Sequence, residues 1–149
     1  MLVPSISRYM TAQPWTIERD ASLADAYHLM REHDIRHLPV VDNGDLVGVV
    51  SERDVHLLAN VADIALTGVP VTEAMKERPF VVTSDAMLDE VVAIMADHKY
   101  GSAIVIGRDG VEGIFTTIDA CRALAEVLQR AVAETMGLSS DALLTHPGS

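Results

Sequence analysis

The residues with the clearest chemical potential are two hydroxyl–carboxylate pairs at the same spacing. Ser51 precedes Asp54 by three residues, and Thr116 precedes Asp119 in the same way. Each pair follows an apolar segment typical of a buried strand and begins a segment with helical periodicity. Such a pair can form a capping box, in which both side chains bind backbone N–H groups of the first helical turn. It can instead bind a ligand, since a helix N-terminus attracts phosphate and a short carboxylate accepts hydrogen bonds from a ribose diol.

Three observations favour a ligand over a cap alone. The pattern occurs twice, and the acid is Asp both times, although the longer Glu is the usual partner in a capping box. Each helix N-terminus is also expected at a sheet edge, beside a cleft. The sequence therefore predicts two sites for a ribose phosphate, with simple capping as the alternative.

The two pairs occupy equivalent places in an internal repeat. Residues 10–54 align with residues 75–119 without a gap, and the Asp of each pair is among the identical positions. Duplication of this extent indicates two copies of one structural unit. We expect a first repeat at residues 1–69, a second repeat at 70–136 and a tail at 137–149.

Each repeat has the same predicted order of elements: a short strand, a helix, a hairpin around a Gly-containing turn, and a closing helix. In the first repeat we predict a strand at 15–17, a helix from 23, hairpin strands at 38–41 and 46–50, and a helix at 53–65. In the second repeat we predict a strand at 80–82, a helix from 88, hairpin strands at 103–106 and 111–115, and a helix from 118 towards 137. The hairpin strands are almost wholly apolar, so both faces of each sheet must be covered. We expect a mixed α/β fold in which helices cover one face and the other repeat's sheet covers the second, with pseudo-twofold symmetry.

Two glycines, Gly48 and Gly113, lie inside predicted strands. A glycine in a strand often marks a place where another backbone or a ligand comes close. We expect a close approach at both positions.

The second closing helix is longer than the repeat requires and has an apolar stripe. Its members recur at helical spacing: Ile118, Cys121, Leu124, Ala125, Leu128 and Val132. The stripe can cap the core of its own repeat or form a dimer seam, and the sequence does not separate these alternatives. Within such a stripe, Cys121 is expected to be a buried, inert thiol.

Composition narrows the class of partner. The chain has 149 residues and a formal net charge of −11, with only two lysines, so binding to nucleic acid or an anionic membrane is not expected. We find no apolar run long enough to span a bilayer and no signal-peptide pattern, and a lone cysteine fits a reducing compartment. These features predict a cytoplasmic location.

The pattern resembles a tandem pair of CBS (cystathionine beta-synthase) domains over roughly residues 5–127. The resemblance is carried by residues 30–33, 35–42 and 48–55, and again by 95–105 and 113–119. It implies two β-α-β-β-α units packed through their sheets, with two clefts for AMP, ADP, ATP or S-adenosylmethionine. It further implies a regulatory module of the type that stands alone and pairs into a homodimer. The residues themselves predict no enzymatic activity, because no base, nucleophile and oxyanion site converge. They also predict no metal site, because the helix is expected to end between His33 and His37.

The resemblance also assigns roles by position. Asp54 and Asp119 match the ribose-binding acid, and Ser51 and Thr116 match the nearby hydroxyl. The residues expected to line the base and the phosphates are Thr16, Ile17, Arg36, His37, Leu38, Pro39 and Arg53 in the first repeat, and Val82, Thr83, Ser102 and Ala103 in the second.

The repeats diverge where phosphate would bind. Arg53 aligns with Ile118, and Arg36 aligns with Gly101. We therefore expect the first site to hold the charged end of a nucleotide better than the second. The alternative function is a dimerisation scaffold for another protein, with empty clefts.

Overall fold

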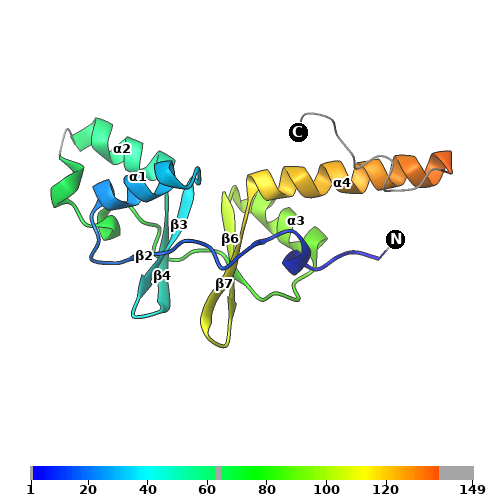
Figure 1. The fold of residues 1–149 in the computed structure, drawn as a ribbon, viewed down its shortest axis with the longest axis horizontal. Coiled ribbons are helices and arrows are strands. Elements are labelled where there is room, and N and C mark those ends of the chain that lie inside the picture. The colour runs from blue at the N-terminus through cyan, green and yellow to red at the C-terminus, as the bar shows by residue number, and fades with distance from the viewer. Residues whose placement is uncertain (1, 63–64, 138–149) are drawn as a thin grey trace.

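The computed structural model describes residues 2–62 and 65–137, which form two α/β units placed side by side (Figure 1). The first unit has a three-stranded sheet in the order β2 (Ile17–Glu18), β3 (His37–Asp42), β4 (Asp45–Ser51). The second has a four-stranded sheet in the order β1 (Thr11–Ala12), β7 (Gly110–Thr116), β6 (Ser102–Gly107), β5 (Val81–Val82). The two sheets lie in the middle and the helices on the outside, as predicted.

Each unit repeats one strand and helix order. In the first, α1 (Leu23–Glu32) joins β2 to β3, and α2 (Glu52–Ala62) follows β4. In the second, α3 (Leu88–His98) joins β5 to β6, and α4 (Thr117–Met136) follows β7. Strand β2 is parallel to β3, β5 is parallel to β6, and both hairpins are antiparallel. The predicted β-α-β-β-α units and hairpins are confirmed.

Turn chemistry accounts for the hairpins and for the end of the last helix. Asn43 and Gly44 join β3 to β4 with φ values of 50° and 91°, which Asn and Gly adopt most readily. Gly137, with φ of 71°, ends α4 in the left-handed conformation. The rest of the predicted tail lies outside the described residues.

The units meet through their sheets. A small apolar cluster of buried Val49, Ile104 and Ile114 lies between β4, β6 and β7. Larger clusters fill the space between each sheet and its helices. The contact between repeats is therefore thinner than the core of either unit.

The segment that precedes each repeat packs on the other repeat, which the sequence analysis did not predict. Strand β1 pairs antiparallel with β7, and Lys76 forms the matching bridge with Val49. Ile6, in the short helix η1 (Ile6–Arg8), and Val71, in η3 (Val71–Glu73), are both fully buried in the core of the opposite unit. This reciprocal exchange ties the units together and brings second-repeat residues to the end of β4.

The strand glycines make this exchange possible. A Cβ on Gly48 would lie 2.6 Å from the sulfur of Met75 and 2.7 Å from the carbonyl oxygen of Lys76. A Cβ on Gly113 would lie 2.5 Å from the sulfur of Met10. The predicted approach of another backbone is confirmed at Gly48, whereas at Gly113 the close group is the side chain of Met10; both groups belong to the exchanged segments.

The apolar stripe of α4 faces outward. Leu124, Leu128, Val132 and Met136 are between 49% and 64% exposed, so the stripe does not cap its own core. The prediction that Cys121 is buried is wrong: its side chain is exposed on the same helix. Among the described residues, no helix combines the length and the apolar character that crossing a membrane requires.

Candidate functional site

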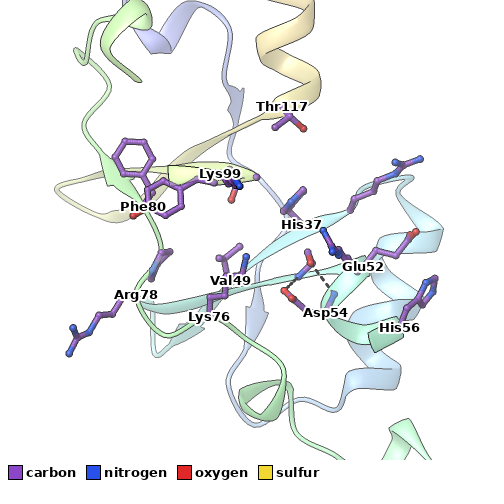
Figure 2. A pocket seen from close by; sticks show the side chains of 17 residues that line it. His37, Val49, Glu52, Asp54, His56, Lys76, Arg78, Phe80, Lys99 and Thr117 are labelled. Carbon is purple, nitrogen blue, oxygen red and sulfur yellow. Dashed lines mark hydrogen bonds between the residues drawn. The ribbon is translucent and has the colours of Figure 1, made fainter. Parts of the chain in front are cut away.

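A cavity of about 500 Å³ opens between the two units, in front of the N-terminus of α2 (Figure 2). Such a volume lies within the range of small-molecule sites. Its lining comes from both repeats: Arg36, His37, Val49, Ser51, Glu52, Arg53, Asp54 and His56 from the first, and Lys76, Arg78, Pro79, Phe80, Lys99, Tyr100, Gly101, Ser102 and Thr117 from the second. Neither repeat forms the site alone.

The pair Ser51 and Asp54 forms a capping box at the edge of this cavity. The N–H of Ser51 donates to Oδ2 of Asp54 over 3.0 Å, and the N–H of Asp54 donates to the Ser51 hydroxyl over 3.1 Å. The capping interpretation is therefore correct. Only Oδ2 takes part in the box, so Oδ1 of the half-buried carboxylate is left for a ligand. Cap and binding site are compatible.

The cavity concentrates positive charge in an acidic protein. Arg36, Arg53, Lys76, Arg78 and Lys99 line it, with the carboxylates of Glu52 and Asp54, which gives a formal charge of +3 when both histidines are neutral. The whole chain carries −11. Within the described residues these five cations form no ion pair, whereas Arg8, Arg19, Arg122 and Arg130 each do. The local field therefore favours an anion.

His37 lies at the start of β3, on the inner side of the cavity. Burial lowers the pKa of its imidazole below the ordinary value of 6.5; the Asp54 carboxylate opposes this shift, and Lys76 and Arg36 add to it. A Cβ on the facing Gly101 would lie 3.1 Å from its Nε2. At neutral pH the ring is a neutral hydrogen-bonding group between the two repeats.

Aromatic rings form part of the second-repeat wall. The ring centroids of Phe80 and Tyr100 are 5.3 Å apart, and Tyr100 stacks on His98 at 5.1 Å. Figure 2 shows Phe80 across the cavity from Asp54. Such rings offer a flat apolar surface for a base.

The second pair, Thr116 and Asp119, has the same cap but different surroundings. The Thr116 N–H donates to Oδ2 of Asp119 over 2.9 Å, and Oδ1 lies 3.7 Å from the guanidinium of Arg122. The Asp119 side chain is nearly buried. It lines neither the cavity above nor the smaller one of about 390 Å³ beside it. The smaller cavity is lined by Val92, Met95, Ala96 and Ala120, together with Lys99, Tyr100, Gly101 and Thr117, which also line the first.

The sequence profile of the CBS domain matches residues 6–58 and 71–126, more than half of the chain. The chain belongs to the CBS domain family. Hypoxic response protein 1 of Mycobacterium tuberculosis is 28% identical over 136 residues, covering 88% of this chain and 95% of that protein.

Solved CBS structures have the same fold. The structure of AcuB from Vibrio cholerae, described as an acetoin utilization protein, has a TM-score of 0.75 at 35% identity and covers 86% of this chain and 95% of that one. The structure of CBSX2 in complex with AMP has a TM-score of 0.72 at 28% identity and covers 83% of this chain and 98% of that one. The match extends over both CBS repeats.

The structure brings six of the fifteen predicted site residues together in the cavity: Arg36, His37, Ser51, Arg53, Asp54 and Ser102. Ile17, Leu38, Pro39 and Ala103 are instead buried in or beside the cores. Thr16 and Val82 are half-buried outside the cavity lining, and exposed Thr83 bonds to Asp85. Thr116 and Asp119 cap α4.

Sequence reasoning missed the half of the cavity that comes from the second CBS repeat. Lys76, Arg78 and Phe80 arrive with the exchanged segment, and Lys99 and Tyr100 follow the end of α3. The chain has only two lysines, and the structure places both of them in this cavity. Nothing local in the sequence says that they meet.

Proposed function

We propose that this CBS pair is a regulatory module without enzymatic activity that binds an adenosyl nucleotide in the cavity between its repeats. One observation carries the proposal: the capped N-terminus of α2, with a free carboxylate oxygen on Asp54, faces a positively charged cavity closed by the other repeat. A ribose phosphate needs these two kinds of partner.

Each part of the ligand has a chemically matched partner. The ribose diol donates to Oδ1 of Asp54, the phosphates lie near the N-terminus of α2 and the surrounding cations, and the base packs on the Phe80 and Tyr100 wall. The complex of the related CBSX2 with AMP supports an adenosyl ligand. AMP, ADP, ATP and S-adenosylmethionine are the candidates.

Regulation would follow because both repeats contribute residues to the cavity. A ligand that touches both repeats stabilises one relative arrangement of them over another. A binding protein transmits a signal only to the extent that its ligand prefers one arrangement. A ligand in the cavity would add its contacts to those that already join the repeats, namely the small cluster between the sheets and the exchanged segments.

A panel of adenosyl compounds in a thermal unfolding assay tests the function. A ligand present at a hundred times its Kd stabilises the folded state by about 2.7 kcal/mol. For a chain of this size we expect a rise in Tm of about 5–10 °C. If AMP, ADP, ATP and S-adenosylmethionine all leave Tm unchanged, the proposal is wrong.

We also propose that the outward stripe of α4 binds a second copy of the chain. Leu124, Leu128, Val132 and Met136 recur every four residues along one helix, and such a row packs against an identical row around a twofold axis. Leu128→Glu is expected to convert a dimer to a monomer in light scattering, whereas Glu134→Gln on the same helix is not. A wild-type monomer at high concentration would refute the dimer, and retention of another protein by that monomer would favour the scaffold.

A further inference from the structure

We propose that the cavity selects its adenosyl ligand by the length of the phosphate chain. It binds a nucleoside di- or triphosphate, whose phosphates contact cations from both repeats, and the second cleft of the pair does not. This inference rests on the proposed function and names its ligand class. It is argued from the number of cations that line the cavity, from the repeats that supply them, and from their lack of ion-pair partners among the described residues.

The cations are placed as a receptor for several negative charges. Two of them, Arg36 and Arg53, flank the Ser51–Asp54 cap in the first repeat, and Lys76, Arg78 and Lys99 come from the second repeat. Within the part of the chain that the structure describes, none of the five has an ion-pair partner. Unpaired like charges around one cavity repel each other, so a polyanion there relieves a repulsion in addition to forming new contacts.

The pseudo-symmetry of the chain supplies an internal comparison. The places equivalent to Lys76, Arg78 and Lys99 hold Thr11, Gln13 and Asp34, and those equivalent to Arg36 and Arg53 hold Gly101 and Ile118. At the other end only Arg36, the equivalent of the lining residue Gly101, supplies a cation, and the place of Lys99 is taken by an acid. Polyphosphate recognition is confined to the cleft at α2.

The charge also ranks the candidate ligands. ADP and ATP carry more negative charge than AMP, 5′-methylthioadenosine carries none, and the sulfonium of S-adenosylmethionine is a cation that the +3 lining repels. We therefore expect affinity in the order ATP, ADP, AMP, methylthioadenosine, S-adenosylmethionine. Because the cations come from both repeats, each added phosphate also strengthens the link between them.

Isothermal titration of the whole chain with these five compounds, in EDTA so that nucleotides keep their full charge, tests the ranking. We expect ATP to bind at least about tenfold more tightly than AMP, which corresponds to about 1.4 kcal/mol, and its affinity to fall as salt is raised. The variant Lys76→Gln/Lys99→Gln should lose about tenfold in ATP affinity and leave methylthioadenosine binding unchanged. The matched control is Arg108→Gln, which removes one positive charge at an exposed turn outside the cavity and should change neither.

The outcomes separate this inference from the function on which it rests. Equal affinity for ATP and methylthioadenosine, or an equal loss of both in the double lysine variant, would overturn polyphosphate selection while adenosyl binding stands. Absence of heat and of thermal stabilisation with all five compounds would overturn adenosyl binding itself. Equal loss of ATP affinity in Arg108→Gln would show a general charge effect and also overturn the inference.

Discussion

The N-termini of α2 and α4 carry the same hydroxyl–carboxylate cap and lie in different environments. At α2, Oδ1 of Asp54 is free and a charged cavity lies in front of it. At α4, Oδ1 of Asp119 faces Arg122, a position occupied by Leu57 on α2. The capping box occurs in both repeats, whereas the charged cavity occurs in front of the α2 cap and depends on residues from the other repeat.

The exchanged segments supply part of the surroundings of each helix N-terminus. Lys76 and Arg78 follow the bridge to Val49, so a segment of the second repeat supplies the cations opposite the α2 cap. The reciprocal segment brings Thr11 and Gln13 to the other end. The two repeats share one scaffold, and their clefts differ because the exchanged segment contributes Lys76 and Arg78 while Arg36, Arg53 and Lys99 come from other parts of the chain.

The largest predicted difference between the clefts is in ligand binding. Asp54→Asn should keep the cap, because the amide oxygen still accepts from the Ser51 N–H, but it removes the charge that we propose binds the ribose. Losing a charge-assisted hydrogen bond costs about 1.5–3 kcal/mol, so ATP affinity should fall by about 10- to 150-fold in calorimetry. Asp119→Asn is the matched control and should bind ATP as the wild type does. Equal losses in both variants would refute the asymmetry.

A smaller difference is expected in stability. Gly48→Ala places a Cβ against the backbone carbonyl of Lys76, which cannot move without disturbing the exchanged segment, and overpacking of this kind costs about 1–3 kcal/mol. Gly113→Ala meets only the flexible side chain of Met10 and should cost less. Urea unfolding measures both free energies. A larger loss of unfolding free energy in Gly113→Ala than in Gly48→Ala would contradict these contacts at the two glycines.

The smallest expected effect concerns pH. His37 has a folded-state pKa below its usual 6.5, so on acidification the unfolded chain takes up the proton first, and stability falls as the pH drops below about 6.5 towards the folded pKa. The equivalent residue, Ser102, does not titrate. Denaturant unfolding at pH 7.5 and pH 5.5 should therefore show a smaller loss in His37→Gln than in the wild type. An equal loss of stability in His37→Gln and the wild type would show that groups other than His37 cause the pH dependence between pH 7.5 and pH 5.5.

Local patterns were enough to predict most of the fold. Apolar periodicity and turn residues placed the hairpins and helices, and the nearly continuous apolar strands predicted the packing of sheet on sheet. The exchange was missed because β1 is only two residues long and its partner is about a hundred positions away. Cys121 was wrongly placed in a core because an apolar stripe has the same spacing whether it is buried or exposed.

Most of the predicted residues that line the cavity are close together in sequence; Ser102, which was predicted for the second repeat, is the exception. The cap residues were found by a local motif, and the resemblance added Arg36, His37 and Arg53, which lie close to them in sequence. Phe80 and Lys99 reach the cavity through the pairing of repeats, which no local pattern encodes. Of the residues placed by resemblance, Arg36, His37 and Ser102 line the cavity, whereas Leu38 and Ala103 are fully buried core residues.

The number of ATP molecules bound per chain tests the central claim most directly. Calorimetric titration of the wild-type protein should give one site per chain, because a single cleft combines a free carboxylate oxygen with converging cations. Two sites of similar affinity per chain would contradict this account, since the cleft at α4 would then bind ATP without the groups to which we assign its recognition.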